Sequence, residues 1–451
     1  MSWLLNKLEA NKESDAIVVH NKTYSYRELI DEINFWTEVI TVSQIPQSSV
    51  VSIQGENSLS LISLFFSLYF NGCIIVPLNS SAGINNLEYQ EIAEADYSIN
   101  LDESFPGFHK TSFSSNHVFY KKLRDDKSSG IVLFSSGTTG KPKAMILNMN
   151  KMMSKFRDLN NSLRILSFLS YDHIGGINTI LHTLCGGGCV IFSSDKTPKN
   201  VLSTIDRWHV QVLPTTPTFI NMLLMSDLLA RYDLSTLSLV TYGTEPMPPI
   251  TLQRISEKLP NIKFKQTYGL SEVGILPTKS KNNNELWLKI GGEGFNYKII
   301  DSILWIKSNT AMLGYLNAES PFDDDGYFNT QDLVEVDGEY IRILGRKSEI
   351  INVAGEKVYP AEVEGLLGEI PGVLDVIVTG MKNPITGMGI KAFIKCNDMI
   401  DRGNLKTKII KYTSSRLEKY KQPMVYTFTT EDLHSCRFKK KRSFTDLKGL
   451  E

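Results

Sequence analysis

A turn rich in hydroxyl groups, glycines and lysines is the part of this 451-residue chain best suited to chemistry. It follows an apolar strand expected over residues 131–134. Gly137 and Gly140 can adopt positive φ angles, which lets main-chain N–H groups approach an anion closely. Hydroxyl donors and positive charges come from Ser135, Ser136, Thr138, Thr139, Lys141 and Lys143. The turn is therefore predicted to hold phosphate.

The spacing of this turn excludes the P-loop of common nucleoside triphosphatases. A P-loop has four residues between its glycines and follows its lysine with Ser or Thr at the start of a helix. Here two residues separate the glycines, Pro142 follows Lys141, and residues 144–147 are expected to form another strand. Ser, Thr and Gly also dominate ordinary solvated turns. The phosphate prediction therefore depends on the rest of the chain.

Four downstream segments combine aromatic, hydroxyl, carboxylate and basic side chains. They are Thr267-Tyr-Gly-Leu-Ser-Glu272, Phe328-Asn-Thr-Gln-Asp332, Gly345-Arg346 and Ile351-Asn-Val-Ala-Gly-Glu-Lys-Val-Tyr-Pro-Ala-Glu-Val-Glu364. In this order and at these separations, together with the phosphate turn, they resemble the adenylate-forming superfamily. That superfamily contains acyl-CoA synthetases, carrier-protein ligases, adenylation domains of peptide synthetases and luciferases. The resemblance runs from about Thr23 to the C-terminus, and the turn at 135–143 is its most specific part.

The resemblance implies ATP and Mg²⁺ as the partners of a carboxylic acid, which is joined to the α-phosphate and then attacked by a thiol. Tyr268 would stack on adenine, Asp332 would accept both ribose hydroxyls, and Arg346 would lie near ribose and phosphate. Glu272 and Thr139 would hold Mg²⁺, a hard ion that prefers oxygen ligands. The residues that the resemblance assigns to the nucleotide are Ser135, Ser136, Gly137, Thr138, Thr139, Gly140, Lys143, Gly243, Thr244, Glu245, Tyr268, Gly269, Ser271, Asp332 and Arg346.

Each of these side chains also has a purely structural interpretation. Tyr268 could be core packing, Asp332 a turn former and Arg346 a surface charge. Glu272 could be an acid at the start of a helix, where the macrodipole favours it. The joint occurrence of all four with the phosphate turn favours the functional interpretation. One departure from the family pattern is Gln331, which replaces the usual glycine before Asp332.

A basic run near the C-terminus departs further from the pattern. The family closes with a Gly-Lys pair whose lysine bridges the acyl carboxylate and the α-phosphate, whereas residues 433–442 contain no glycine. Counting from the upstream side, with His434 in the place of the family's proline, selects Lys440 as that lysine. Counting back from Leu447 selects Lys441. We predict that Lys440 is catalytic, the alternative being a solvated basic segment.

The acid-binding residues are the hardest to predict. Residues 168–176 resemble the family motif that ends in His-x-x-Gly, whose histidine, here His173, borders the acyl site. A helix expected over 177–184 should line the pocket, together with residues 242–244 and 273–274. Asp172 is unusual for acyl-CoA synthetases. Because a buried carboxylate has to be paired or neutralised, Asp172 should meet a cationic substrate group or a protein donor, or face water.

The elements that must position these residues are those of an α/β protein. Alternating β-rich and helical segments from residue 50 to about 265 predict doubly wound, mostly parallel sheets. Strands separated by turns between about 286 and 344 predict a small antiparallel barrel or sheet. The last hundred residues or so are enough for a small α+β domain. We expect a large AMP-binding and acyl-substrate domain at 1–346 and a small mobile domain at 347–451.

Composition narrows the possible partners. A formal net charge of −1 gives no overall bias toward nucleic acid or anionic membranes. The five cysteines lack the spacing of a zinc site, and Cys185-Gly-Gly-Gly-Cys189 is typical of a tight apolar turn, so a cytoplasmic location is expected. The apolar run at 59–78 is interrupted by Asn71-Gly72 and predicts a buried helix and strand, not a membrane span. We also expect no signal peptide.

The sequence thus predicts a stand-alone AMP-forming acid–thiol ligase for a small or medium carboxylic acid. The acyl acceptor would be CoA or the phosphopantetheine arm of a separate acyl or peptidyl carrier protein, because no attachment motif is seen in this chain. Two alternatives remain: a stand-alone amino-acid adenylating enzyme, and a catalytically silent nucleotide-binding homologue.

Overall fold

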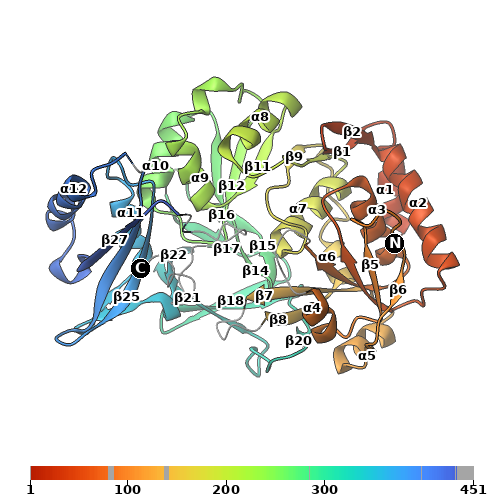
Figure 1. Cartoon of the computed structure of the whole chain (residues 1–451). Coiled ribbons are helices and arrows are strands. Elements are labelled where there is room, and N and C mark those ends of the chain that lie inside the picture. The colour runs from red at the N-terminus through yellow and green to blue at the C-terminus, as the bar shows by residue number, and fades with distance from the viewer. Residues whose placement is uncertain are drawn as a thin grey trace.

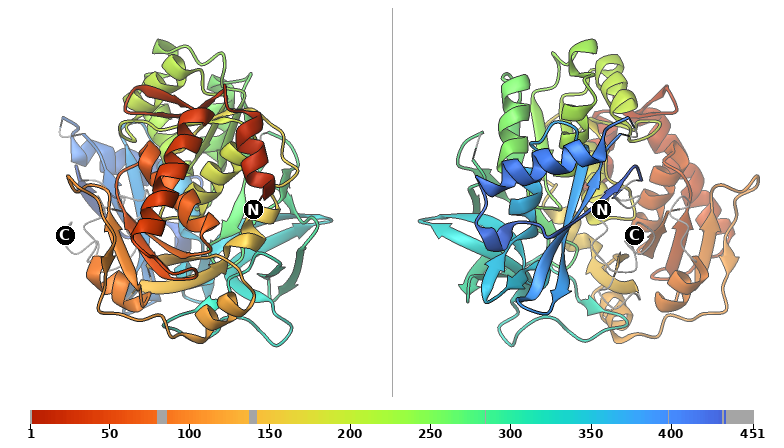
Figure 2. Two further views of the ribbon diagram at one scale, coloured as in Figure 1. Left: turned by 90° about the vertical axis from the view of Figure 1, so that its right-hand side faces the viewer. Right: turned by 60° about the vertical axis from the view of Figure 1, so that its left-hand side comes forward.

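A computed structural model of the chain describes residues 2–79, 86–136, 142–283, 285–397, 399–431 and 433. Two seven-stranded sheets form the centre of the larger part of the molecule, and an antiparallel sheet closes one side of it (Figure 1). The residues after 346 form a separate lobe, drawn in blue, which Figure 2 shows from two further sides.

The first seven-stranded sheet carries the predicted phosphate turn. Its central strands pair in parallel, and their buried apolar residues on both faces suit a sheet covered on both sides. The strand that enters the turn and the strand that leaves it pair antiparallel. The strand order is β20 (Gly314–Tyr315), β8 (Pro142–Asn148), β7 (Gly130–Ser136), β4 (Ile74–Leu78), β3 (Val50–Gln54), β5 (Tyr97–Asn100) and β6 (His109–Lys110).

Helices on this sheet and the chain's first helices complete its packing. The helix after β3 begins at a Ser58 cap and is almost entirely buried, as its apolar composition predicts. These helices are α1 (Ser2–Ala10), α2 (Tyr26–Val42), α3 (Leu59–Phe70), α4 (Asn86–Ile92), α5 (Val118–Asp125) and α6 (Met149–Ser154).

The second seven-stranded sheet is parallel apart from one edge strand. Its order is β13 (Lys263–Gln266), β12 (Leu239–Tyr242), β11 (Val212–Thr215), β9 (Arg164–Leu166), β10 (Cys189–Ile191), β1 (Asp15–Val19) and β2 (Lys22–Ser25). Its helices are α7 (Ile174–Cys185), α8 (Pro198–Trp208), α9 (Pro217–Met225) and α10 (Pro249–Lys258). In open parallel sheets ligands bind outside the carboxyl ends of the strands, and here residues 243–245 and 267 follow two such ends.

Beyond these sheets the chain becomes antiparallel. A short hairpin comes first, formed by β14 (Tyr268–Leu270) and β15 (Gly274–Leu276). The six-stranded sheet has the order β16 (Thr278–Ser280), β17 (Leu288–Ile290), β22 (Tyr340–Arg346), β21 (Phe328–Asp337), β19 (Ile303–Ser308) and β18 (Phe295–Ile300). The predicted change from parallel to antiparallel organisation is confirmed.

The residues after 346 have an apolar core of their own. A 3₁₀ turn at Lys347–Glu349 leads into β23 (Ile351–Val353), β24 (Glu356–Val358), α11 (Pro360–Leu367), β25 (Asp375–Asn383), β26 (Gly387–Lys395), α12 (Arg402–Ser414) and β27 (Val425–Thr429). Polar contacts join this lobe to α10, since the Arg254 guanidinium donates to the main-chain oxygen of Glu369 at 3.1 Å. The division at residue 346 therefore remains our proposal for the domain boundary, supported by the separate core.

One expected helix differs in length from that observed. Helix α7 begins at Ile174 instead of 177, because the His173 side chain caps it and both glycines of the following pair are helical. Thr216 caps the start of helix α9, and a 3₁₀ turn at Leu229–Arg231 follows its end.

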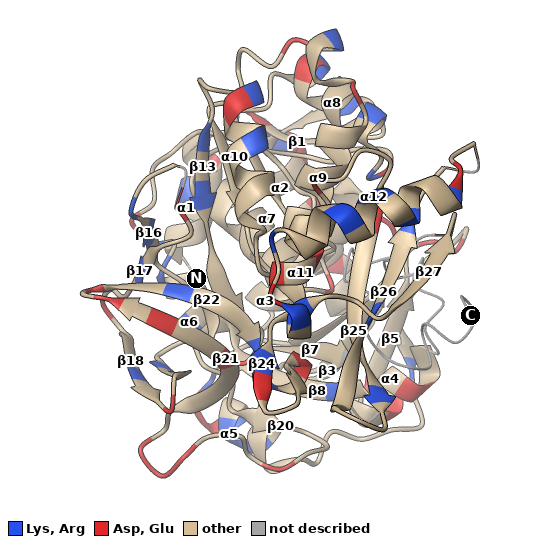
Figure 3. Cartoon of the chain, turned by 90° about the vertical axis from the view of Figure 1, so that its left-hand side faces the viewer, with Lys and Arg blue, Asp and Glu red and all other residues tan. Residues whose placement is uncertain are grey.

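The surface fits the low net charge. In the view of Figure 3, positions of Lys and Arg and positions of Asp and Glu are both scattered over the elements. None of the helices in the described part of the chain could serve as a transmembrane span.

Candidate active site

Tyr268, Asp332 and Arg346 meet where the β14–β15 hairpin lies beside the antiparallel sheet; we call them the nucleotide cluster. The Tyr268 hydroxyl donates to Asp332 Oδ2 at 2.5 Å, and Arg346 Nε lies 3.4 Å from Asp332 Oδ1. Burial raises the pKa of the Asp332 carboxyl, while the Arg346 charge and the Tyr268 hydrogen bond oppose that shift. The three side chains are thus brought together, and the carboxylate is oriented from both sides.

The backbone before Asp332 explains why a glycine is usual there. Gln331 has φ of 61°, in the left-handed region, which costs a residue other than glycine roughly 1–2 kcal/mol. Hydrogen bonds hold the turn in place: the Asn329 side chain accepts from the Gln331 N–H at 3.0 Å, and the Thr330 hydroxyl accepts from the Asp332 N–H at 3.0 Å. Asp332 also lies directly opposite Arg346 in the β21–β22 pair.

A second group forms around Tyr315; we call Glu272, Tyr315 and Lys143 the carboxylate cluster. Glu272 lies in the turn between β14 and β15, directly after Ser271, and not at the start of a helix. Its Oε1 accepts a hydrogen bond from the Tyr315 hydroxyl at 2.9 Å. Lys143 Nζ lies 5.3 Å from the centroid of the Tyr315 ring, a cation–π distance.

Sequence reasoning missed Tyr315. It lies on β20, where it pairs with Met145 of β8, the strand that carries Lys143. No local motif marks the tyrosine, because its role follows only from this pairing of strands far apart in sequence. Burial and then the Glu272 charge raise the pKa of its hydroxyl, which therefore stays a donor at neutral pH.

The described residues can be checked for side chains that could hold the Mg²⁺ implied by the family resemblance. Among the residues with described positions, no group of three or more His, Cys, Asp or Glu could hold a metal ion. Mg²⁺ in phosphate-transfer sites keeps several waters and takes one or two carboxylates together with substrate phosphates. Glu272 fits this mode, because the hydrogen bond from Tyr315 occupies only part of the accepting capacity of its carboxylate.

Glycines allow close approaches at the strand ends. A Cβ at Gly243 would lie 2.6 Å from Thr267 Oγ1, and one at Gly269 would lie 2.7 Å from the Gly274 oxygen. The loop after β12 therefore packs on the start of the hairpin. Thr244 follows with φ of 71°.

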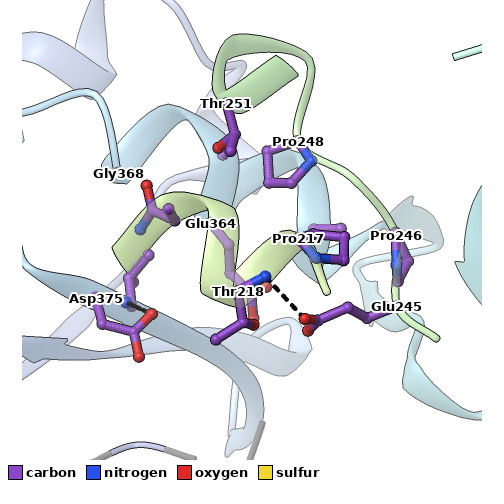
Figure 4. Close-up of a pocket in the computed structure, with 13 residues that line it drawn as sticks. Pro217, Thr218, Glu245, Pro246, Pro248, Thr251, Glu364, Gly368 and Asp375 are labelled. Atoms are coloured by element: carbon purple, nitrogen blue, oxygen red, sulfur yellow. Dashed lines mark hydrogen bonds between the residues drawn. The ribbon is translucent and has the colours of Figure 1, made fainter. Parts of the chain in front are cut away.

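A hydrogen bond joins the Glu245 side chain to helix α9. Its Oε1 accepts from the Thr218 N–H at the start of α9, at 2.9 Å. Figure 4 shows it beside a pocket that also borders Glu364 and Asp375 of the second lobe. The nucleotide contact predicted for Glu245 thus stays a prediction.

His173 caps the start of α7, and its place beside the acyl site stays a prediction. Its Nδ1 accepts from the Gly175 N–H at 3.1 Å, which leaves the hydrogen of a neutral imidazole on Nε2. Asp172 is 5% exposed, so the possibility that it faces water is wrong. Its charge contributes, after burial, to raising the pKa of Tyr171.

Several predicted residues lie at or beyond the edge of the described structure. Ser135 pairs with Lys143 across β7 and β8, at the base of the phosphate turn. The turn itself, with Gly137, Thr138, Thr139 and Gly140, lies outside the described residues, as do Lys440 and Lys441. The Ser136 side chain also lies outside the described part of the structure. These assignments remain predictions.

Comparisons with known proteins find similar sequences along most of the chain. The sequence profile of the family described as AMP-binding enzyme matches residues 110–316, and that of the AMP-binding enzyme C-terminal domain matches 362–440. A 2–succinylbenzoate–CoA ligase of Enterococcus faecalis is 24% identical over 94% of this chain and 93% of its own. Acyl-CoA synthetase 7 of Caenorhabditis elegans is 29% identical over 72% of this chain and 67% of its own.

Solved structures agree on the fold. The crystal structure of the anthranilate CoA ligase AuaEII in complex with anthranoyl-AMP has a TM-score of 0.80 to this chain at 19% identity. The similarity covers 97% of this chain and 95% of that one. The predicted fold class is confirmed.

Proposed function

Because this chain belongs to the adenylate-forming superfamily of AMP-binding enzymes, we propose that it is an AMP-forming ligase that joins a small or medium carboxylic acid to CoA. The observation that carries the proposal is the convergence of the nucleotide cluster and the carboxylate cluster on one hairpin, β14–β15. The hairpin thereby holds the residues that would bind the nucleoside at a fixed separation from those that would stabilise the phosphate charge.

The nucleotide cluster would bind the nucleoside part of ATP. Asp332 retains accepting lone pairs for ribose hydroxyls after its contacts with Tyr268 and Arg346. Arg346 is half-exposed, with 51% of its side chain accessible, so its guanidinium can also reach a phosphate. The Tyr268 ring is buried and held through its hydroxyl, which fixes the plane of the ring on which adenine would stack.

The carboxylate cluster would stabilise the charge that develops as the acid attacks the α-phosphate. Lys143 supplies a positive charge at the base of the phosphate turn, and Glu272 would hold Mg²⁺, which neutralises phosphate charge when bound. Tyr315 orients the Glu272 carboxylate by its hydrogen bond. Preorganised charges of this kind need no rearrangement at the moment of reaction.

CoA is the acceptor that the relatives favour. The Enterococcus faecalis relative, matched along nearly the whole of both chains, is named a CoA ligase. A separate carrier protein would present the same pantetheine thiol, so the chemistry at this site would be unchanged. The acceptor is tested by incubating the enzyme with ATP, Mg²⁺, an acid panel and either CoA or a phosphopantetheinylated carrier, and by identifying thioesters by mass spectrometry. Acyl-CoA is the expected product; a thioester on the carrier alone would assign the carrier as acceptor.

The basic run offers a second test. If Lys440 bridges the acyl carboxylate and the α-phosphate, Lys440→Ala should lose adenylate formation yet still convert a supplied acyl adenylate to thioester, because attack by the thiol does not need that charge. Lys439→Ala and Lys441→Ala are the matched controls and should keep both steps. Split behaviour in Lys441→Ala instead would move the assignment by one residue.

A further inference from the structure

The Asn317 side chain makes two hydrogen bonds to the main chain, one on each side of Lys143. Its Nδ2 donates to the Pro142 oxygen at 2.8 Å, and its Oδ1 accepts from the Ala144 N–H at 3.0 Å. The orientation of the amide follows from its partners, because a main-chain oxygen only accepts and an N–H only donates. Asn317 lies two residues after Tyr315 and belongs to none of the predicted motifs. A side chain distant in sequence therefore brackets Lys143.

The strand pairing explains why the amide reaches this place. Strand β20 is the edge strand of the first sheet and pairs antiparallel with β8 (Figure 1). Just beyond it, the Leu316 N–H donates to the Ala144 oxygen at 2.9 Å. The same register, continued by one residue, places Asn317 opposite Lys143, and there its side chain replaces the main chain as the partner of β8. Ser135 of β7 pairs with Lys143 on the other side.

The same segment also contacts Glu272. The Met312 N–H donates to the main-chain oxygen of Glu272 at 2.8 Å, and the Tyr315 hydroxyl donates to Glu272 Oε1. We call residues 312–317 the connector, because they join the turn of the β14–β15 hairpin to the strand that carries Lys143. One short segment thus sets the positions of Glu272 and Lys143 relative to each other.

The Lys143 side chain depends on the connector for its position. In the described part of the chain, no Asp or Glu forms an ion pair with Lys143. Its ammonium group lies 5.3 Å from the centroid of the Tyr315 ring. A long, flexible side chain is placed accurately only when its main chain and its neighbours are fixed. Asn317 fixes the main chain, and Tyr315 is the neighbour.

We propose that Asn317 is a positioning residue for adenylation, which holds the main chain of Lys143 so that the lysine ammonium meets the phosphates of ATP. The inference rests on the proposed function, which it deepens by adding a residue outside the predicted motifs. Asn317 acts through Lys143 and contacts no substrate itself. Its loss should therefore affect the steps that involve the departing pyrophosphate. It should spare AMP binding and the attack of a thiol on a supplied acyl adenylate.

The first test is pyrophosphate exchange by Asn317→Ala. We expect a loss of about ten- to a hundredfold, on the order of that caused by misplacing a reacting group by about 1 Å. Asn148→Ala is the matched control, because Asn148 ends the same strand, β8, and its Oδ1 accepts from the Lys151 N–H at the start of α6. This control loses a helix cap and is therefore destabilised, yet it should keep wild-type exchange.

A double-mutant cycle shows whether Asn317 acts through Lys143. In the Lys143→Ala background, adding Asn317→Ala should lower exchange by no more than about twofold, because the group that Asn317 positions is already gone. An asparagine with only a structural role would cause the same loss in both backgrounds. Such an additive loss, or wild-type exchange in Asn317→Ala alone, would overturn the inference.

Binding separates this inference from the proposed function. Calorimetric titration of Mg²⁺–ATP and of AMP into the wild type and Asn317→Ala requires no turnover. If the wild type shows no exchange with any acid, the proposed function is wrong and binding alone decides the role of Asn317. Weaker ATP binding by about three- to tenfold, the range for one ordinary hydrogen bond, with unchanged AMP affinity would support that role. An equal change for both nucleotides, or a change for neither, would overturn it.

Discussion

The nucleotide cluster and the carboxylate cluster are positioned in different ways. In the nucleotide cluster, Asp332 and Arg346 lie opposite each other on neighbouring strands, and the Tyr268 hydroxyl donates to Asp332. In the carboxylate cluster, Tyr315 of β20 donates to Glu272 of the β14–β15 turn, and Lys143 of β8 lies beside the Tyr315 ring. The second cluster therefore depends on the pairing of β20 with β8, two strands far apart in sequence.

This difference shows which contacts a local motif can reveal. Asp332 and Arg346 both belong to short motifs, whereas Tyr315 joins its cluster only through the pairing of β20 with β8.

The largest expected effect is at the carboxylate cluster. Glu272→Gln and Lys143→Ala should each lower adenylation by roughly 10²–10³-fold, the loss seen when one preorganised electrostatic group is removed. The assay is pyrophosphate exchange at saturating ATP. Tyr315→Phe keeps the ring beside Lys143 and removes only the hydrogen bond to Glu272, so its loss should be smaller. Wild-type exchange in Glu272→Gln would disprove the role of this cluster.

A selective effect is expected in the second lobe at Gly355. Its φ is 92° in the β23–β24 turn, and no atom lies within 4 Å of an added Cβ in this arrangement. The family resemblance implies that this turn moves to the active site for thiol attack, where a side chain would block the pantetheine. Gly355→Leu should spare pyrophosphate exchange and lower thioester formation by about a hundredfold, on the order of the loss from a misplaced reactant.

A second glycine, Gly338, provides the experimental control for backbone strain. Gly338 also has positive φ, 61°, and open space around it, in the β21–β22 turn. Gly338→Leu should carry a similar conformational cost, about 1–2 kcal/mol, and leave both half-reactions intact. Equal loss of both steps in Gly355→Leu would point to misfolding instead of a blocked passage.

The nucleotide cluster should respond more moderately. Asp332→Asn removes the charge that accepts ribose hydroxyls and pairs with Arg346, so AMP affinity should fall by about ten- to a hundredfold, as for hydrogen bonds to charged groups worth about 1.5–3 kcal/mol. Tyr268→Phe removes one orienting donor and should cost less. Isothermal titration with AMP measures both. An unchanged affinity in Asp332→Asn would remove Asp332 from the ribose site.

The smallest expected effect is a shift with pH. Burial raises the pKa of Asp332 above its ordinary value, so this carboxylate takes up a proton at a higher pH than an exposed aspartate does. Because the ionised Asp332 carboxylate accepts the hydrogen bonds of the ribose hydroxyls, AMP affinity should weaken as the pH falls. The weakening should begin at a higher pH than that at which ordinary aspartates take up a proton. The Asp332→Asn variant should lack this acid limb, and an identical limb in both proteins would assign it to another group.

The structure brings Tyr268, Asp332 and Arg346 together, as their short motifs next to strand ends predict, while their roles toward a nucleotide stay predictions. Tyr268 and Glu272 belong to one hairpin, and Asp332 and Arg346 lie opposite each other in adjacent strands. Tyr315 could not be predicted, because only the pairing of β20 with β8 brings it to Lys143.

The acid end also shows where local reasoning fails. The motif identified His173, which caps α7, but the helix starts three residues earlier than expected. A pair of glycines is typical of a turn, and only the structure shows that the His173 cap makes this pair helical. A Cβ at Gly176 would lie 2.0 Å from the Ser170 oxygen. That glycine is needed for close packing and not for flexibility, a distinction that depends on the tertiary structure.

The most direct test of the central claim is acid-dependent ATP–pyrophosphate exchange by the wild type, measured across monocarboxylic, dicarboxylic and amino acids. We predict exchange that requires an acid and Mg²⁺ and that falls by roughly 10²–10³-fold in Glu272→Gln. Tight AMP binding without exchange for any acid would contradict the claim and identify a silent nucleotide-binding homologue, and exchange confined to amino acids would identify an amino-acid adenylating enzyme.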